Sequence, residues 1–293
     1  MKVLVIGIQG QLAQSLKRQG NEFENISLHF VGRPELDFQD PDSIKRTVVS
    51  KKPDIIINTA GYTAIDKAED EADIAQLING IAPGVLASAA ADIGAKVIHI
   101  STDYVFDGEQ SEPYKETDIT RPMGVYGETK LAGEEAVRAA NPGHVIVRTA
   151  WIYSTYGHNF VKTMLRLAAD RDELSVVHDQ IGNPSSAFDI ADGLLTIVSK
   201  WSHGEQSGLG ETFHLSGTGS ASWAEFAEHI FAISKQNGGP YCQVKKITSS
   251  EYSAKAYRPK NSALDCSKFK SIFHYQAPHW IESLRELETD IFK

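Results

Sequence analysis

Cysteine is scarce in this sequence: only Cys242 and Cys266 occur among 293 residues, and their spacing is not that of a metal-binding pair. A disulfide-stapled secreted scaffold is therefore excluded, and we expect a protein of the reducing cytoplasm. No stretch approaches the ~18 consecutive apolar residues of a membrane-spanning helix. The apolar run at residues 3–6 is too short for a signal peptide. We expect neither a membrane partner nor a bound metal.

Basic charge is also in short supply. The chain has 29 Lys and Arg residues against 38 Asp and Glu, which gives a net charge of -9. Because general nucleic-acid-binding proteins are usually basic, we expect no nucleic-acid partner. An acidic chain can still bind a diphosphate, since local backbone amides and a few cations suffice.

What the sequence does contain is a regular alternation of short apolar runs and helical segments. We expect strands at residues 3–6, 26–31, 54–58, 96–101 and 144–148. Helices are expected at 11–19, 41–51, 72–93 and 125–140, with a break near Pro83 and an end at Gly94. Alternation at these lengths predicts an α/β fold with a doubly wound parallel sheet of the Rossmann type.

The second half of the chain is less regular. We expect helices at 159–169, 187–200 and 222–235, strands at 174–177 and 212–215, and an amphipathic tail at 281–292 that packs on the body. The predicted organisation is a nucleotide-binding domain over residues 1–168 and a smaller C-terminal α/β substrate lobe over 169–293. Segments near 186–216 are expected to return to the first domain.

The first predicted strand runs into a glycine turn, GIQGQLA at residues 7–13. Gly7 permits a tight turn, Gly10 lets the backbone approach a pyrophosphate, and Ala13 is small enough for the helix to pack on the sheet. The N-terminus of the following helix attracts an anion. The turn therefore predicts a dinucleotide site, with an ordinary strand-to-helix turn as the alternative.

The end of the second strand bears on the choice of cofactor. NAD-specific sites often place an acidic residue there, but residues 29–33 read HFVGR. Arg33 could accept a 2′-phosphate, which favours NADPH over NADH, and a solvated loop arginine is an equal alternative. Asp37 and Phe38 follow and could flank the adenine.

Tyr126 and Lys130 form a Y-x-x-x-K pattern at the start of the helix predicted for 125–140. Residues four apart share a helix face, so the ammonium should lie near the phenol and favour the phenolate. Such a tyrosine can pass a proton to or from a substrate oxygen. Thr102 ends the fourth strand, where ligands bind in doubly wound sheets, and offers a hydroxyl to the same oxygen.

The pattern occurs a second time, at Tyr241 and Lys245. That pair falls in a predicted strand, where residues four apart are about 13 Å distant and make no close pair. An ordinary helix pair is the alternative for Tyr126 and Lys130. The glycine turn and Thr102 favour a reductase, with Tyr126 as proton donor.

Longer stretches carry a family resemblance: residues 58–69, 101–108, 125–134, 148–153, 159–164, 178–184 and 258–262. Through them the sequence resembles the dTDP-4-dehydrorhamnose reductases, members of the extended short-chain dehydrogenase/reductase superfamily. The match covers nearly the whole chain. It implies hydride transfer from NADPH or NADH to C4 of dTDP-6-deoxy-L-lyxo-4-hexulose. The product would be dTDP-L-rhamnose, a precursor of cell-surface polysaccharide.

The resemblance also implies residue roles. Thr102, Tyr126 and Lys130 match the catalytic residues. Thr102, Asp103 and Trp151 match sugar-nucleotide contacts, with a core aromatic as the alternative for Trp151. The cofactor contacts expected with them lie in the glycine turn, after the second strand, after the third and on the helix at 125–140: Gly7, Gln9, Gly10, Gln11, Leu12, Arg33, Asp37, Phe38, Ala60, Gly61, Tyr62, Thr63, Tyr126 and Lys130. Lys130 can bind the nicotinamide ribose hydroxyls.

Arg258 is a further candidate, because a guanidinium can grip diphosphate oxygens; a loop salt bridge is the equal alternative. Three positions depart from the family pattern. Ala13 replaces a glycine, Gly124 stands where an asparagine is usual, and residues 185–186 are Ser-Ser where threonine is usual. Gly124 lies two residues before Tyr126, so the particular sugar stays open. The family's magnesium dependence is not carried over, since the residues near Glu286 do not match.

Two other functions fit the same motifs. One is another sugar-nucleotide reductase or epimerase of the superfamily. The other is a non-catalytic regulatory subunit of the methionine adenosyltransferase type, which shares the fold. The sequence is compatible with a homodimer and does not fix the oligomeric state.

Overall fold

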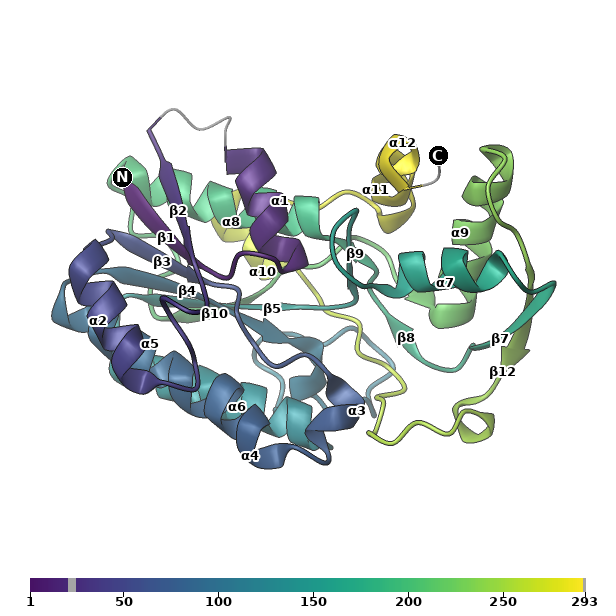
Figure 1. The fold of residues 1–293 in the computed structure, drawn as a ribbon, viewed down its shortest axis with the longest axis horizontal. Coiled ribbons are helices and arrows are strands. Elements are labelled where there is room, and N and C mark those ends of the chain that lie inside the picture. The colour runs from purple at the N-terminus through teal and green to yellow at the C-terminus, as the bar shows by residue number, and fades with distance from the viewer. Residues whose placement is uncertain (21–24, 292–293) are drawn as a thin grey trace.

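The computed structural model describes residues 1–20 and 25–291. Within these residues, parallel strands form a central six-stranded sheet in the order β2-β1-β3-β4-β5-β10 (Figure 1). The strands are β1 (Lys2–Ile6), β2 (Ser27–Val31), β3 (Ile55–Asn58), β4 (Lys96–Thr102), β5 (His144–Thr149) and β10 (Glu211–His214). The predicted doubly wound α/β fold is confirmed.

Helices cover both faces of this sheet (Figure 1). One face packs on α1 (Gln11–Gln19), α8 (Ala187–Ser202) and α10 (Ser267–Phe273). The other packs on α2 (Pro41–Lys51), α5 (Ala82–Asp92) and α6 (Val125–Ala140). The central strands are buried on both sides, which is why they read as nearly continuous apolar runs rather than alternating patterns.

The strand order reverses at β1. The chain passes from β1 to β2 on one side and then returns to β3 on the other. In doubly wound sheets such a switch point opens a crevice at the carboxyl ends of the strands. The glycine turn after β1, α3 (Ile65–Ala68) after β3, and the short helix η3 (Asp103–Val105) after β4 all stand at this edge.

The helical segment before β4 differs from the expectation. It runs through α4 (Ala72–Ala75), the π-helical turn η2 (Gln76–Ile81) and α5 as one continuous helical segment, without the predicted break. Pro83 follows directly after the π-helical turn, so the helix changes its hydrogen-bond pattern there instead of ending. Gly94, at a φ of 72°, ends the segment as predicted. By length and composition, residues 72–92 could cross a membrane, but half of this stretch is buried and it packs on α2 and α6.

A smaller lobe lies beside the carboxyl edge of the sheet, at the right of Figure 1. Its strand pairs are β7 (Glu173–Val177) with β12 (Gln243–Ile247), β8 (Ile181–Gly182) with β11 (Ala221–Ser222), and β6 (Ile152–Tyr153) with β9 (Ser185–Ser186). Its helices are α7 (Phe160–Ala168), α9 (Trp223–Gln236), α11 (Trp280–Glu286) and α12 (Glu288–Ile291), with the 3-10 turn η4 (Ser249–Glu251) after β12.

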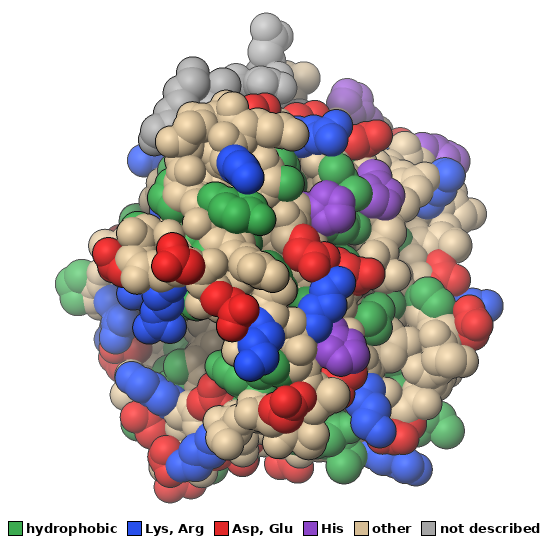
Figure 2. Space-filling model, turned by 90° about the vertical axis from the view of Figure 1, so that its right-hand side faces the viewer, with side chains coloured by type: hydrophobic (Ala, Val, Ile, Leu, Met, Phe, Trp, Pro, Cys, Tyr) green, Lys and Arg blue, Asp and Glu red, His purple; other side chains and the backbone are tan. Residues whose placement is uncertain are grey.

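These elements share a hydrophobic core to which Met164, Leu174 and Phe226 contribute. The predicted packing of the C-terminal tail is confirmed through Ile291, because Leu284 and other apolar residues of α11 and α12 enter this core; Phe292 lies outside the described residues. On the face drawn in Figure 2, basic and acidic side chains are interspersed.

Candidate active site

A cleft of about 1300 Å³ separates the carboxyl edge of the sheet from the smaller lobe. Most of the residues singled out in the sequence line it, although they come from segments at the ends of five different strands, β1, β3, β4, β5 and β12. They are Gly7, Gln9, Gly10, Gln11, Leu12, Ala60, Gly61, Tyr62, Thr63, Thr102, Asp103, Tyr126, Lys130, Trp151 and Arg258. Arg33, Asp37 and Phe38 do not line it.

The glycine turn has the geometry of a diphosphate cradle. Gly7 has a φ of 120°, and a Cβ there would lie 2.7 Å from Oγ1 of Thr59. A Cβ at Gly10 would meet nothing within 4 Å, so the backbone at this point is open to a ligand. Gly10 also supplies no capping side chain to α1, which leaves the amides of the first turn for an anion. The turn therefore fits the diphosphate of a dinucleotide.

Gln11 differs from the other residues of the turn because its side chain is hydrogen-bonded to the smaller lobe. Its Oε1 accepts hydrogen bonds from Oγ of Ser154 (2.9 Å) and from Nδ2 of Asn159 (2.9 Å). Asn159 in turn caps α7 by accepting the amide of Lys162. The side chain of Gln11 is thus hydrogen-bonded to the smaller lobe. Its backbone amide, in the first turn of α1, is the group that remains for an anion.

The loop after β3 is held by Asn79, a buried residue of the π-helical turn η2. Its Oδ1 accepts the amide of Tyr62 (2.8 Å), and its Nδ2 donates to the carbonyl of Tyr62 (3.0 Å). Gly61 packs against Asn79 and faces Nζ of Lys130. Because Asn79 also donates to Oγ1 of Thr129, this clamp holds residues 60–63 against α6. The clamp was not predicted, because nothing in the sequence marked residues 76–81 as a π turn.

Thr102 and Tyr126 meet at the base of the cleft. The hydroxyl of Thr102 donates to Oδ1 of Asp103 (3.0 Å) and adjoins the Tyr126 phenol. Tyr104 packs edge-on against Tyr126, with ring centroids 5.6 Å apart. Burial raises the pKa of Tyr126 above its usual value, more strongly than the contact with Thr102 lowers it. Tyr126 is therefore a protonated phenol at neutral pH.

Lys130 lies one turn further along the same face of α6 and is buried. Its Nζ donates to the carbonyl oxygen of Ile100 at 2.6 Å. Burial lowers the pKa of Lys130 to about 8, while the charge of Glu134 opposes this shift. The sequence predicts that Lys130 favours the phenolate of Tyr126, but burial raises the pKa of Tyr126, and Lys130 is not among the groups that shift it.

Asp103 lines the cleft and keeps one carboxylate oxygen buried without a hydrogen-bond partner among the described residues. The residue as a whole is buried, and this oxygen is Oδ2. Burial raises the pKa of Asp103 to about 6, although hydrogen bonds from Ser262 and Thr102 counteract it. An orphaned carboxylate oxygen beside Tyr126 is suited to accept a hydrogen bond from a sugar hydroxyl.

Trp151 forms part of the opposite wall. Its ring stacks on that of Trp223, with centroids 3.4 Å apart and planes 5° from parallel. The backbone of Trp151 has a φ of 43°, a left-handed conformation that costs a non-glycine residue free energy. A strained aromatic residue held by stacking at a cleft wall is typical of a ligand-binding surface rather than of a core position.

Arg258 makes a salt bridge and also lines the cleft. Its Nη2 pairs with Oδ2 of Asp66 at 2.8 Å, and its Nη1 donates to the hydroxyl of Tyr104 at 3.2 Å. The salt bridge considered from the sequence therefore exists. The same guanidinium lines the cleft, and its contact with Tyr104 places it near Tyr126.

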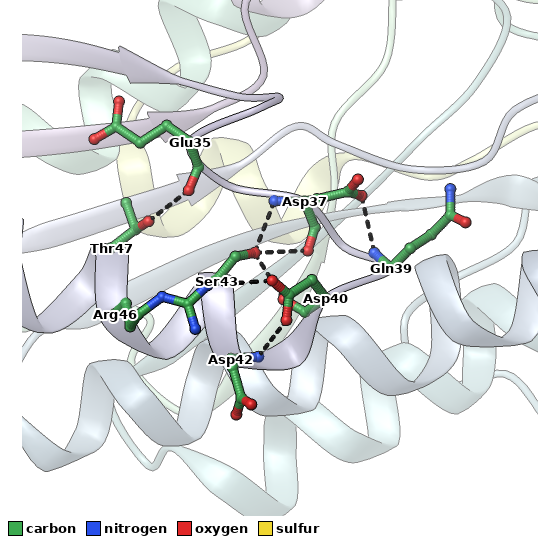
Figure 3. Close-up of polar contacts among 8 residues, drawn as sticks. All are labelled: Glu35, Asp37, Gln39, Asp40, Asp42, Ser43, Arg46 and Thr47. Carbon is green, nitrogen blue, oxygen red and sulfur yellow. Dashed lines mark hydrogen bonds and ion pairs between the residues drawn. The ribbon is translucent and has the colours of Figure 1, made fainter.

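The three residues outside the cleft lie beyond the end of β2. Phe38 is buried in the core beneath α2. Asp37 accepts the amide of Gln39 (3.0 Å), and its backbone exchanges hydrogen bonds with Oγ of Ser43 (Figure 3). Arg33 is exposed. These contacts organise the loop between β2 and α2.

The residues that the smaller lobe contributes to the cleft were not predicted from the sequence. One face of α7 lines it with side chains at helical spacing: Phe160, Thr163, Met164 and Leu167. Arg171 and Gln180 follow on the same wall. The helical period of this apolar face was visible in the sequence, but nothing indicated whether it faced a core or a ligand. Over residues 1–20 and 25–291, no group of three or more His, Cys, Asp or Glu side chains is arranged to hold a metal ion.

Comparison with known proteins adds to this geometry. Residues 1–291 match the family described as the RmlD substrate binding domain. The chain is 45% identical to a dTDP-4-dehydrorhamnose reductase of Sinorhizobium fredii, in an alignment that covers 98% of this chain and 96% of the relative.

Solved structures agree. The fold is similar to that of a dTDP-4-dehydrorhamnose reductase from Clostridium acetobutylicum, with a TM-score of 0.88, 39% identity and coverage of 98% of each chain. A dTDP-4-dehydrorhamnose reductase from Bacillus anthracis, solved in complex with NADP, gives a TM-score of 0.88 and 37% identity over 97% of each chain.

Proposed function

The chain belongs to the dTDP-4-dehydrorhamnose reductase family of NAD(P)H-dependent oxidoreductases, and we propose that it reduces the C4 keto group of dTDP-6-deoxy-L-lyxo-4-hexulose to give dTDP-L-rhamnose. The observation that carries the specific reaction is the protonated phenol of Tyr126 beside the Thr102 hydroxyl in the cleft wall. The cytoplasm is the proposed location.

Reduction of a ketone adds a hydride to carbon and a proton to oxygen. When bound, the nicotinamide cofactor supplies the hydride. Tyr126 supplies the proton to the C4 oxygen. The Thr102 hydroxyl, which donates to Oδ1 of Asp103 in this structure, would turn to donate its hydrogen bond to the C4 oxygen and so polarise the carbonyl. A tyrosine keeps its proton at neutral pH, and burial raises the pKa of Tyr126 further, so the residue holds the proton that this direction of the reaction requires.

The proposed cofactor site combines the glycine turn with the loop after β3. The open backbone at Gly10 and the uncapped amides of α1 would hold the diphosphate. Residues 60–63 would contact the remainder of the dinucleotide, and the buried ammonium of Lys130, which faces Gly61, would bind the nicotinamide ribose. We keep Arg33, Asp37 and Phe38 as proposed contacts for the adenine end, outside the cleft itself.

The sugar nucleotide would occupy the other half of the cleft. Asp103 offers its unsatisfied oxygen to a sugar hydroxyl, Trp151 offers an aromatic face, and Arg258 offers cationic donors to the diphosphate. Because α7 packs in the core of the smaller lobe, we propose that the substrate-binding unit begins before α7 rather than at residue 169. Segment 186–216 then belongs with the cofactor domain, since α8 packs on α1 and β10 extends the large sheet.

The direct test is to offer the 4-keto-6-deoxy sugar nucleotide with NADPH, then with NADH, and to follow loss of absorbance at the nicotinamide band. We expect turnover that depends on the keto sugar, and product with the chromatographic mobility and NMR spectrum of dTDP-L-rhamnose. No turnover with either cofactor would contradict the proposal and favour a non-catalytic role. Turnover that gives a different sugar would show a different specificity at the same site.

Activity should depend on the protonation of Lys130. Its buried ammonium has a pKa of about 8, so the positive charge is present below that pH and is lost above it. We expect kcat/KM for the cofactor, which reports groups of the free enzyme, to fall above about pH 8. Lys130→Arg, which stays charged, should remove this decline even if it lowers the rate. A profile that stays level to about pH 10, the ordinary range of lysine, would contradict the assignment.

Arg33 gives a separate prediction about cofactor choice. A guanidinium near the adenine ribose favours the 2′-phosphate of NADPH, so Arg33→Ala should raise the KM for NADPH about tenfold and leave that for NADH unchanged. Arg46→Ala is the matched control, because Arg46 is an exposed arginine of the same region that pairs with Asp40 (Figure 3). If Arg33→Ala has the same KM for NADPH and the same KM for NADH as wild type, Arg33 does not bind the 2′-phosphate.

A further inference from the structure

The catalytic helix α6 begins without a side chain of its own to cap it. The N-cap residue is Gly124, which has extended backbone angles and no side-chain oxygen to accept an amide of the first turn. The first turn of α6 carries Tyr126, so any fraying at this end would displace the phenol directly.

A carboxylate from another element fills this role. Oε1 of Glu69 accepts the backbone amide of Val125, the first residue of α6, at 3.0 Å. Glu69 follows directly after α3, 56 residues earlier in the chain. A Cβ on Gly124 would lie 3.0 Å from the same oxygen, so the carboxylate occupies the space that a side chain at position 124 would need.

The surroundings show why this contact bears on Tyr126. Gly127, in the same first turn of α6, packs so closely on the backbone oxygen of Tyr104 that a Cβ would collide with it. Glu69, Gly124 and Tyr126 line one small cavity of about 10 Å³, which is roughly the space of one water molecule. The end of α6 before Gly127 is therefore held by Glu69 on one side and open to this cavity on the other.

We propose that Glu69 is a positioning residue that caps α6 from the end of α3 and so holds the phenol of Tyr126 in the geometry for proton transfer. A carboxylate suits this task, since it accepts the amide and also complements the positive end of the helix dipole. Because α3 continues the loop of residues 60–63, the contact ties the cofactor side of the cleft to the catalytic helix. The inference rests on the proposed function in that it assigns the proton transfer to Tyr126.

The experiment compares three variants with wild type. Glu69→Ala removes the cap and should lower kcat about tenfold, or about 1.4 kcal/mol of barrier, with little change in the KM for the cofactor. Glu69→Gln keeps an acceptor oxygen and should retain most of the rate. In Glu69→Ala with Gly124→Asn, the new asparagine can cap the helix from within and should restore kcat, whereas a merely structural loss elsewhere would not be rescued.

Glu128→Ala is the matched control. Glu128 is an exposed acidic residue in the first turn of the same helix, so its removal changes the charge near the helix end without removing the hydrogen bond to Val125. We expect its kcat to stay within about twofold of wild type. A loss equal to that of Glu69→Ala would overturn the proposal, because general helix electrostatics would then explain the effect.

A second readout does not depend on turnover. Hydrogen exchange at the amide of Val125 should accelerate in Glu69→Ala. When Gly124→Asn is added, exchange should slow at the amides of Tyr126 and Gly127, the second and third residues of α6, because an N-cap side chain accepts from those positions. If the Val125 amide exchanges slowly in wild type and faster in Glu69→Ala, but the enzyme does not reduce the keto sugar, the cap exists and the proposed function fails. If the enzyme is active while Glu69→Ala keeps both full kcat and slow exchange, the proposed function stands and the positioning role is overturned.

Discussion

Tyr126→Phe is expected to lower kcat about 10²–10⁴-fold, the range that a positioned general acid contributes. The substitution removes one oxygen and keeps the ring, including its edge-on contact with Tyr104. Cofactor affinity should change little, since the phenol delivers a proton and does not carry the charge that binds the dinucleotide. Steady-state rates with saturating NADPH and keto sugar, together with a cofactor titration, measure both quantities.

Tyr241→Phe is the control for this prediction. Tyr241 and Lys245 repeat the Y-x-x-x-K pattern, but Tyr241 is 49% exposed and precedes β12, and its ring lies under Nζ of Lys235. The control should retain the full rate. A Tyr126→Phe enzyme as fast as wild type would show that another group, or water, protonates the C4 oxygen.

Arg148→Met should lower the free energy of unfolding by about 3–5 kcal/mol, because it leaves a buried carboxylate without its main partner. Nε and Nη2 of Arg148 donate to the two oxygens of Glu134 at 2.9 and 2.8 Å, and both side chains are buried. Urea unfolding at neutral pH, followed by circular dichroism, measures the loss.

The controls separate this buried pair from an exposed one. Arg138 also pairs with Glu134, at 2.8 Å, but its side chain is 36% exposed, so Arg138→Met should cost less than about 1 kcal/mol. Glu134→Leu combined with Arg148→Met removes both charges and should recover much of the stability. Equal losses for Arg138→Met and Arg148→Met would contradict the assignment.

The same pair sets an expectation for pH. Burial acts to raise the pKa of Glu134, but the hydrogen bonds and charge of Arg148 outweigh it and hold the pKa below its ordinary value of 4.5. The contribution of Glu134 to stability is therefore complete above about pH 4.5 and is lost as the pH falls below it. In Arg148→Met this part of the acid sensitivity should be absent.

Periodicity predicted the large sheet well because its strands are buried on both faces and so carry an unbroken apolar signal. The helix at 125–140 has the predicted bounds. The break expected near Pro83 is absent, since a proline signal in a sequence does not tell whether the helix ends there or continues with a changed hydrogen-bond pattern.

The site shows a similar limit. Motif spacing was sufficient to predict that Tyr126, Lys130 and Thr102 lie in one cleft. It was not sufficient to give the protonation of Tyr126, which depends on burial, or the hydrogen bond from Lys130 to the carbonyl of Ile100. Contacts between distant segments, such as Glu69 with Val125, leave no local pattern in the sequence and require the folded chain.

The side chain of Gln11 connects the two walls of the cleft through hydrogen bonds. Its side-chain oxygen accepts hydrogen bonds from Ser154 and Asn159, and Asn159 is the N-cap residue of α7. The glycine turn is thus joined by hydrogen bonds to the start of a helix that lines the other wall of the cleft. A shift of the turn must either break two hydrogen bonds or move the start of α7 with it. We therefore expect the two walls of the cleft to move together.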